Sequence, residues 1–254
     1  MKRRHSLLAV FAVSCASATR VPESSANRLT SYSGTNCVEM VLIRSVSPDA
    51  LQALLPARYK LAPGPDGAGQ LAFAIYTCDR LTLDASSADP GVVAEISARI
   101  QSPDGSEGRH AYLLHLLTSS RPLADALARF GDVFRYAPAA TFTVGPRTPG
   151  ADNVARATIE SDQVAFSTVG DPVKEPAEEP VVYDGKGVTF WLETGRERVK
   201  LDYRVPRLLP RSTGALTMKV ARIDPALASF GDTASGTGAF LRFDAKVLVT
   251  VVPP

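Results

Sequence analysis

The sequence has little cysteine and histidine, two residue types by which many functional sites are recognised. Its 254 residues include three cysteines and three histidines, and the charged residues nearly balance, with a formal net charge of +2. The histidines, His5, His110 and His115, have no ligand spacing with the cysteines, so no metal site is predicted. The near-neutral charge lacks the electrostatic footprint of a nucleic-acid-binding protein. We therefore expect no cofactor and no nucleic-acid partner.

No run beyond the N-terminus is long and apolar enough to span a membrane as a helix. The N-terminus itself is typical of a secretory signal peptide over residues 1–18: basic MKRRHS, apolar LLAVFAV and small residues in SCASA. Cleavage after Ala18 removes Cys15, whereas AVSC approximates a bacterial lipobox in which Cys15 becomes the lipidated N-terminus. The sequence leaves both sites open. We expect a secreted, periplasmic or cell-surface protein, with this lipid anchor as its only membrane attachment.

The polar, aperiodic residues 19–35 predict a flexible tether. Residues 36–254 are interpreted as a single domain, because all-β domains often reach this length. Nothing in the sequence indicates an oligomeric state.

Two cysteines, Cys37 and Cys78, remain in the mature chain at the edges of predicted strands. In an oxidising compartment such a pair predicts one disulfide. The closed loop of about 40 residues would stabilise the fold by roughly 4 kcal/mol through chain entropy. The alternative is a pair of buried free thiols.

Short apolar, β-rich runs dominate the rest of the chain, and we count about eleven predicted strands. They are separated by turns and do not alternate with helices, which argues against a doubly wound parallel sheet. The sequence predicts a mainly β fold, either an antiparallel closed barrel or cone or a two-sheet sandwich. The Gly-rich stretch 231–240, GDTASGTGAF, is expected to be a flexible hairpin loop.

Helix signals are confined to a few places. Ser47 and Pro48 predict the start of a short helix over SPDALQALL. SSRPLADALARFG has the strongest helical pattern, with its apolar residues on one face and Gly131 suited to a C-terminal stop. A last helical turn is predicted at DPALASFG. The stretch that follows the second helix, GDVFRYAPAA, is expected to be a connector.

Several segments, taken in order, resemble the acetoacetate decarboxylase-like family. The first is LIRSVSPDALQALLP, in which Arg44, Pro48, Leu54, Leu55 and Pro56 match a family pattern: a strand ending in aromatic-Arg-Thr-Asp-Pro, then a short helix ending in Leu-Leu-Pro. The matching segments extend from about residue 38 to 144. The resemblance implies a closed, cone-like β barrel around an internal pocket.

The second segment is VVAEISARI, which resembles a family strand that carries a pocket glutamate, here Glu95. The third is GDVFRYAPAA. In the family this active segment reads Gly-Arg-Glu-x-x-Gly-x-Pro-Lys-Lys, and Gly131 and Pro138 match it with identical spacing. Asp132, Val133 and Tyr136 stand where the family has Arg, Glu and the second Gly, and Ala139 and Ala140 replace both lysines.

The two alanines decide whether the family's reaction is expected here. In the family, the first lysine forms a Schiff base with a β-keto acid, and the second lowers its pKa by like-charge repulsion. An alanine methyl group can do neither. Lys200 and Lys219 lie on other predicted strands, where lysines usually face solvent. Decarboxylation through that imine is therefore not expected.

The resemblance singles out Arg44, Glu95, Tyr136 and Ala139 as candidate ligand-binding residues, and none as catalytic. Arg44 could bind a carboxylate through its planar fork, or be a salt-bridged surface residue. Glu95 could be a pocket acid, or lie on a solvated strand face, since it alternates with Val93 and Ser97.

The leading functional hypothesis is an internal pocket that binds a small hydrophobic or carboxylate-bearing molecule without Schiff-base chemistry. The alternative is an enzyme on the same scaffold, of lyase, hydratase or aldolase-like type, that uses Arg44 and Glu95 instead of a catalytic lysine. A third hypothesis is a cell-surface interaction protein whose barrel is filled.

Overall fold

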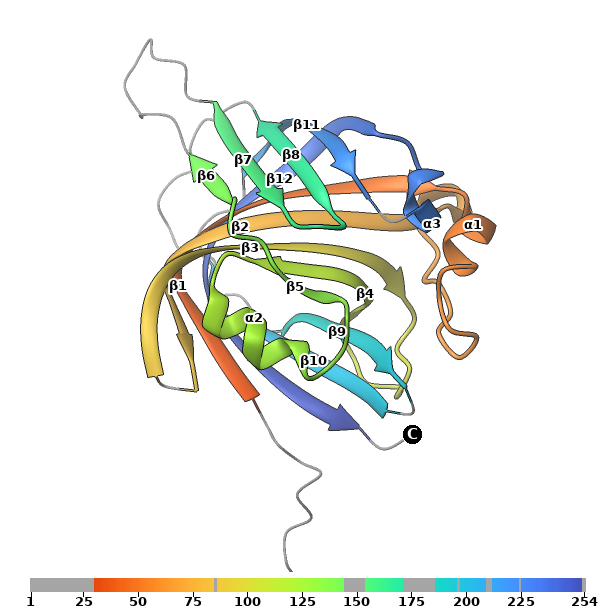
Figure 1. Ribbon diagram of the computed structural model, residues 1–254. Helices are drawn as coiled ribbons and strands as arrows, with labels where there is room; N and C mark the ends of the chain where they lie inside the picture. The colour runs from red at the N-terminus through yellow and green to blue at the C-terminus, as the bar shows by residue number, and fades with distance from the viewer. Residues whose placement is uncertain are drawn as a thin grey trace, which may run out of the picture.

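Seven strands close into a ring in the computed structural model, which describes residues 30–84, 86–143, 154–170, 186–195, 197–208, 212–223 and 225–252. The ring closes because the last strand pairs with both β10 and β1 (Figure 1). Its strands, in spatial order, are β1 (Thr30–Val46), β2 (Gly69–Leu83), β3 (Ser86–Ile100), β4 (Arg109–Thr118), β9 (Lys186–Thr194), β10 (Glu197–Leu208) and β12 (Thr233–Val252). The prediction of a mainly β fold is confirmed.

A second sheet continues from the same last strand. The early part of β12 pairs with β11 and its later part with β10, so one long strand belongs to both layers. The sheet then runs through β11 (Ser212–Arg222), β8 (Ala165–Gly170), β7 (Ala155–Glu160) and β6 (Thr141–Thr143). Figure 1 shows these strands lying across the outer side of β2 and β3. The barrel and the two-layer sandwich, alternatives from the sequence, thus occur together.

Strand alternation divides the hydrophobic residues between two cores. On β2, Tyr76 and Cys78 point into the barrel, where they join side chains from the other six strands of the ring. Leu71 and Phe73 point outward into a separate core between the barrel wall and the second sheet. Phe73 meets Phe166 of β8 there, with ring centroids 6.1 Å apart. A single strand therefore supplies both cores, which fixes its register.

Helix α2 (Arg121–Ala128) packs onto the barrel core through Leu123 and Leu127. The Ser120 hydroxyl caps it by accepting from the backbone N–H of Leu123, and Gly131, just beyond its end, has a positive φ of 134°. The helix predicted at this place is confirmed. The other two predicted helices also form, as α1 (Pro48–Gln52), capped by the Ser47 side chain, and α3 (Pro225–Ala228). A 3-10 turn, η1 (Pro65–Gly67), precedes β2.

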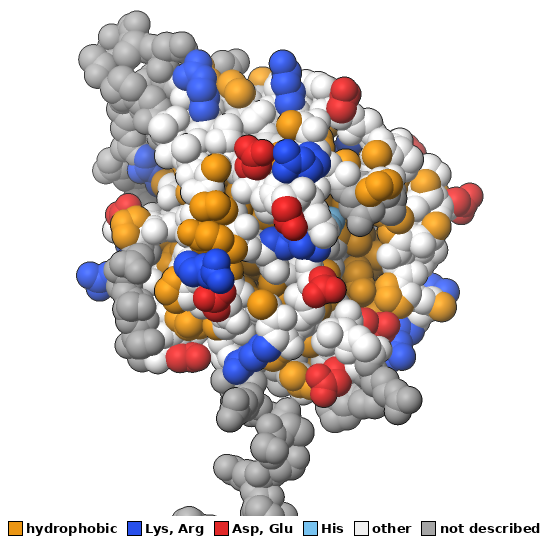
Figure 2. Space-filling view, in the orientation of Figure 1, with side chains coloured by type: hydrophobic (Ala, Val, Ile, Leu, Met, Phe, Trp, Pro, Cys, Tyr) orange, Lys and Arg blue, Asp and Glu red, His pale blue; other side chains and the backbone are white. Residues whose placement is uncertain are grey.

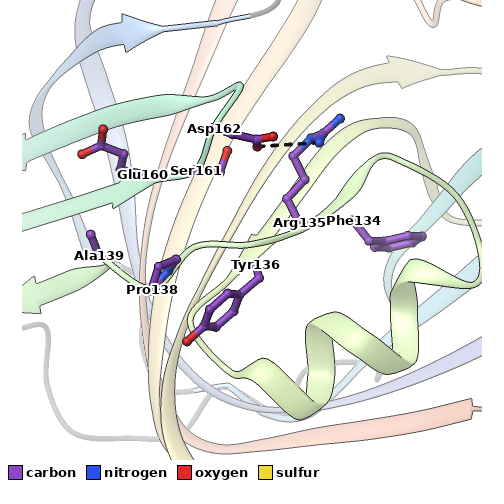
Figure 3. Close-up of a pocket in the computed structure, with 8 residues that line it drawn as sticks. All are labelled: Phe134, Arg135, Tyr136, Pro138, Ala139, Glu160, Ser161 and Asp162. Atoms are coloured by element: carbon purple, nitrogen blue, oxygen red, sulfur yellow. Dashed lines mark ion pairs between the residues drawn. The ribbon is translucent and has the colours of Figure 1, made fainter.

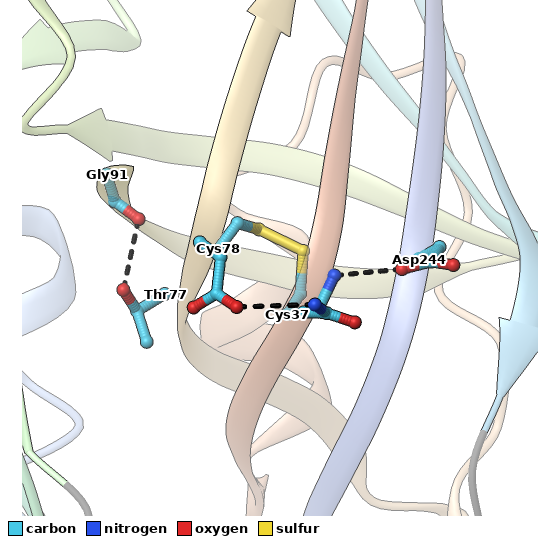
Figure 4. The surroundings of a disulfide bond; sticks show 7 residues. Cys37, Thr77, Cys78, Gly91 and Asp244 are labelled. Carbon is cyan, nitrogen blue, oxygen red and sulfur yellow. Dashed lines mark hydrogen bonds between the residues drawn. A yellow bond between two sulfur atoms is a disulfide. The ribbon is translucent and has the colours of Figure 1, made fainter. Parts of the chain in front are cut away.

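The predicted disulfide between Cys37 and Cys78 is present (Figure 4). The two residues lie directly opposite each other on β1 and β2, and both are buried. A bulge in β1 precedes Cys37, where the backbone N–H of Asn36 donates to Asp244 of β12 over 2.8 Å. A Cβ atom on Gly34 would lie 2.6 Å from both sulfur atoms, so only glycine fits beside the bond. The disulfide thus clamps the first two strands of the barrel.

Three expectations need correction. The tether predicted over 19–35 is wrong in its last part, because β1 begins at Thr30 and pairs there with β12. The predicted loop at 231–240 is wrong for most of its length, because β12 begins at Thr233. The connector after α2 contains a short strand, β5 (Phe134–Tyr136), parallel to β4. In the first two, polar or glycine-rich composition hid strand residues that pair with β1 or β12, far away in the sequence.

The predicted signal peptide, Cys15 and the first part of the tether, through residue 29, lie outside the described residues. Within the described part of the chain, no helix is long and apolar enough to cross a membrane.

Candidate functional site

The structure divides the four predicted ligand-binding residues among three places. Arg44 lies on the outer side of the barrel wall, because it faces the same way as its cross-strand partner Leu71. Its guanidinium donates to the backbone carbonyl of Thr233 over 3.4 Å. Glu95 is on the opposite face of the same sheet, inside the barrel. The pairing of Arg44 with Glu95 in one cavity, expected from the enzyme alternative, therefore does not occur.

Glu95 lies in the barrel with only 5% of its surface exposed. Ala74 of β2 is its direct cross-strand partner and also pairs with Val41 of β1. Glu39 lies two residues before Val41 on β1, so its side chain is on the same face. It lies opposite Tyr76 of β2. The two carboxyl groups thus approach each other diagonally across β2. Sequence reasoning missed Glu39, although it alternates with the half-cystine Cys37 and so shares its inward face.

Both carboxyl groups have pKa values far above the usual range. Burial raises the pKa of Glu39 to about 8, although its residue surface remains partly exposed. Burial, with a smaller contribution from the charge of Glu39, raises the pKa of Glu95 to about 8. Loss of hydration disfavours the charged form, and two close carboxylates repel each other. Near neutral pH the pair therefore holds protons that exposed glutamates would have lost.

Three tyrosines share this interior. Tyr32, Tyr76 and Tyr203 are oriented into the barrel, and their pKa values are raised chiefly by burial. The Tyr76 hydroxyl lies near those of Tyr32 and Tyr203. None of the three hydroxyls, nor Oε1 of Glu95, makes a hydrogen bond of good geometry with a described protein group. The Tyr76 ring meets Phe243 edge-on, with centroids 5.8 Å apart. Buried polar groups are nearly always paired in folded proteins, so this cluster is the strongest mark of function in the barrel.

The lysines whose side chains are described lie elsewhere. Lys200 is on β10 between two inward residues, so it points outward, where its Nζ lies 5.4 Å above the Trp191 ring and 3.4 Å from Asp202. Lys219 is exposed on β11. Neither reaches the carboxyl pair inside the barrel.

The remaining two predicted residues, Tyr136 and Ala139, line a surface groove of about 530 Å³ (Figure 3). One side is the segment from β5 to Ala139, and the other is the turn between β7 and β8. The full lining is Phe134, Arg135, Tyr136, Pro138, Ala139, Glu160, Ser161 and Asp162. Ala139 is exposed in this groove and is not inside the barrel. The motif alignment that gives Ala139 the position of the reactive lysine therefore puts that position on the molecular surface.

The turn that forms one side of the groove is braced from behind. The Ser161 hydroxyl accepts from the backbone N–H of Val164 over 3.0 Å. Arg222 of β11 donates to the carboxylate of Glu160 over 3.2 Å and to the backbone carbonyl of Asp162 over 3.4 Å. The turn is thus held in place mainly by contacts from its own side of the groove, so the groove is preformed.

Charged side chains of both signs mix with hydrophobic ones over the face shown in Figure 2, so this face carries no field of a single sign. Within the described residues, no three His, Cys, Asp or Glu side chains gather as a metal site requires.

The described geometry defines a class: a closed β barrel, layered on its outer wall by a second sheet, with a buried acid pair inside. Solved structures identify the fold more closely. An acetoacetate decarboxylase from Legionella pneumophila superposes with a TM-score of 0.57 at 13% identity, over 87% of this chain and 86% of the other. An acetoacetate decarboxylase-like enzyme from Sphingomonas wittichii gives 0.58 at 14% identity, over 89% and 93%.

A third structure, the enduracididine biosynthesis enzyme MppR complexed with pyruvate, gives a TM-score of 0.54 at 13% identity, over 86% of this chain and 88% of the other. No family model and no curated protein matches the sequence. The chain has the acetoacetate decarboxylase-like fold, as the motifs in its first half implied.

Proposed function

We propose that the barrel interior is an acid–base site for a small carbonyl- or carboxylate-bearing molecule, and that the protein is an enzyme of lyase or hydratase type without an imine intermediate. The observation that carries this proposal is the Glu39–Glu95 pair, two carboxyl groups with raised pKa values on the inner face of the barrel wall. Groups with such pKa values can give or take protons near neutral pH.

The pair suits reactions that pass through an enol. One glutamate, ionised, takes a proton from the carbon beside the substrate carbonyl, while the other, protonated, gives its proton to the carbonyl oxygen. The C–H electron pair becomes the new C=C bond, and the C=O π electrons become the new O–H bond. Each glutamate ends in the other's former state, so the reverse step restores the site. Tyr76 and Tyr203 would add hydroxyl donors near the developing charge.

The similar structures support an enzyme more than a passive binding protein. They include an acetoacetate decarboxylase and an enzyme whose structure holds pyruvate, which is a small 2-oxo acid. A Schiff base is not part of the proposal, because the motif resemblance puts Ala139 and Ala140 at the family's lysine positions and the described lysines lie outside the interior. Borohydride treatment with pyruvate should leave the protein mass unchanged, and a stable adduct would contradict this point.

Proton exchange tests the proposed function directly. In deuterium oxide, the protein should speed the loss of the pyruvate methyl signal in proton NMR. Glu95→Gln and Glu39→Gln should each reduce this rate by at least about 100-fold, since general acid–base groups contribute that much. The matched control is Glu197→Gln, which removes an exposed carboxyl from β10 and should leave the rate unchanged. Equal rates in all four proteins, or no exchange of pyruvate or 2-oxobutyrate, would overturn the enzyme proposal.

The second candidate is a binding protein that uses the same interior. The aromatic packing favours it, because Tyr203 contacts Phe190 and Phe243 with centroids 6.2 and 6.4 Å apart and leaves a largely apolar surround. It predicts saturable binding of a small carboxylic acid that Glu95→Gln weakens, with no proton exchange. Calorimetry and NMR on the same samples separate the two candidates.

Export is part of the proposal. The buried disulfide supports an oxidising compartment. Intact mass of the mature protein distinguishes cleavage after Ala18 from a lipidated Cys15, and retention of residues 1–18 would contradict both.

A further inference from the structure

We infer that the groove between β5 and the β7–β8 turn binds a small zwitterionic amino-carboxylate, with Arg135 holding the carboxylate and Asp162 the ammonium group. This site is separate from the barrel interior, and the inference does not depend on the acid–base function proposed there.

Arg135 is the group that points to a ligand. Its side chain is only 18% exposed, and its Nε atom is buried without a hydrogen-bond partner among the described groups. The described ion pair of its guanidinium, Nη1 to Oδ1 of Asp162, is long at 3.8 Å, and the Asp162 side chain is 76% exposed. A guanidinium presents a planar fork that matches a carboxylate through two parallel hydrogen bonds. Arg135 thus has donor capacity that the fold leaves unused.

Neighbouring arginines do not compete for the same ligand. Arg121 is committed to Asp125, with Nε to carboxylate distances of 2.8 and 3.0 Å, and its guanidinium lies over the Tyr136 ring. Arg222 holds the β7–β8 turn from behind, as described above. Figure 3 shows the Arg135 side chain reaching toward Asp162 and the Tyr136 ring turned the other way, toward α2. Of these three described arginines, Arg135 is therefore the one whose guanidinium is held only by a long ion pair.

The acidic groups on the facing turn select among anions. The carboxylates of Glu160 and Asp162 line the groove and would repel a doubly charged anion such as phosphate. A zwitterion avoids this cost, because its ammonium group can approach Asp162 while its carboxylate pairs with Arg135. One long ion pair is then replaced by two charge-assisted hydrogen-bonded pairs, with no change in net charge. Pro138 and Ala139 leave a small apolar wall for the body of the ligand.

The test uses the whole protein and three related probes: L-leucine, L-leucinamide, which lacks the carboxylate, and N-acetyl-L-leucine, which lacks the ammonium group. Saturation-transfer NMR and calorimetry should detect leucine. Each of the other two should bind at least about tenfold more weakly, as expected for loss of one charge-assisted hydrogen bond. Equal binding of the acetylated form, or no binding of leucine, phenylalanine or glycine at millimolar concentration, would overturn the inference.

Substitutions in the groove test whether leucine binds there. Arg135→Gln should weaken leucine binding at least about tenfold, and Arg135→Lys should restore only part of it, because a lysine lacks the fork. Ala139→Leu fills the groove from an exposed position and should block binding without touching either charge. The control, Arg80→Gln, removes an exposed arginine of β2 outside the groove lining. Unchanged affinity in both Arg135→Gln and Ala139→Leu, with each protein folded by circular dichroism, would place leucine elsewhere and overturn the inference.

Discussion

The barrel interior and the surface groove both hold charged groups, but the two regions treat charge in opposite ways. Inside the barrel, Glu39 and Glu95 have no cationic partner among the described groups, so their charge is suppressed and their pKa values rise. In the groove, Arg135 and Asp162 form an ion pair of opposite charges that is long, and Asp162 faces solvent. The comparison teaches that burial without a counter-charge makes proton donors, whereas partial exposure makes binding groups for ions.

The largest expected effect concerns the disulfide, which lies on the inner wall beside Glu39 and Tyr76. Replacing both Cys37 and Cys78 with alanine should lower the free energy of unfolding by about 4 kcal/mol, as expected for a bond that closes a loop of this length. Urea denaturation measures this loss. A reductant should lower the unfolding free energy of the wild-type protein to that of the double-alanine variant. It should leave the unfolding free energy of the variant unchanged. Equal stability of the two proteins would show that the inner wall does not depend on the bond.

The next effect tests suppression of charge in the interior. Because the folded-state pKa of Glu95 lies above its unfolded value of 4.5, its contribution to stability is fully present below pH 4.5 and is lost as pH rises through about 8. Glu95→Gln should remove this dependence and, at pH 9, stabilise the protein by on the order of 3 kcal/mol. Unfolding free energies of the wild-type and Glu95→Gln proteins at pH 5, 7 and 9 test this prediction. An unchanged pH dependence would mean that Glu95 is solvated or paired.

A smaller effect concerns the unpaired hydroxyl groups. Tyr76→Phe keeps the ring packed against Phe243 and removes an oxygen that lies near the hydroxyls of Tyr32 and Tyr203 but makes no hydrogen bond of good geometry with a described protein group. It should stabilise the protein by about 1 kcal/mol, because a buried unpaired hydroxyl carries a desolvation cost. Thermal unfolding measures the change. Destabilisation instead would show that the hydroxyl is hydrogen-bonded in solution.

The smallest effect is expected in the groove. Arg135→Gln breaks an ion pair that is long and has one highly exposed partner, so the unfolding free energy should fall by less than about 1 kcal/mol. Urea denaturation at low and high salt checks this value, with Arg80→Gln as the control. A loss of several kilocalories per mole would place Arg135 among the structural groups and remove the contrast between the two regions.

Much of the architecture was accessible from local patterns. Ser47 marked the start of α1, and Gly131 lies three residues beyond the end of α2. These signals are local, because caps and stops act within a few residues. The motif around Arg44 implied the right fold. The first part of strand β12 could not be predicted, because its glycine-rich sequence is also typical of a loop. A Cβ on Gly238 would lie 2.8 Å from the Val41 carbonyl oxygen, so these glycines permit close packing between distant strands.

The candidate sites depended still more on long-range contacts. Sequence comparison grouped Arg44, Glu95 and Ala139 in one pocket, but the pleat puts the first two on opposite faces of one sheet and the third on the surface. A shift of one residue exchanges inside and outside on a strand, and weak motifs do not fix register that finely. Glu39 was missed because an acidic residue in an apolar run predicts a solvent-facing position unless the strand closes into a barrel.

By itself, the sequence determined the mainly β class, the pairing of Cys37 with Cys78 and the helix ends. These follow from composition, local backbone preference and residue identity. Tertiary structure alone decided that β12 closes the ring, that Glu39 and Glu95 lie near each other on its inner face, and that Arg135 faces Asp162 across a groove. Each of these joins residues far apart in the chain, and burial, which sets their charge, exists only once the barrel has closed.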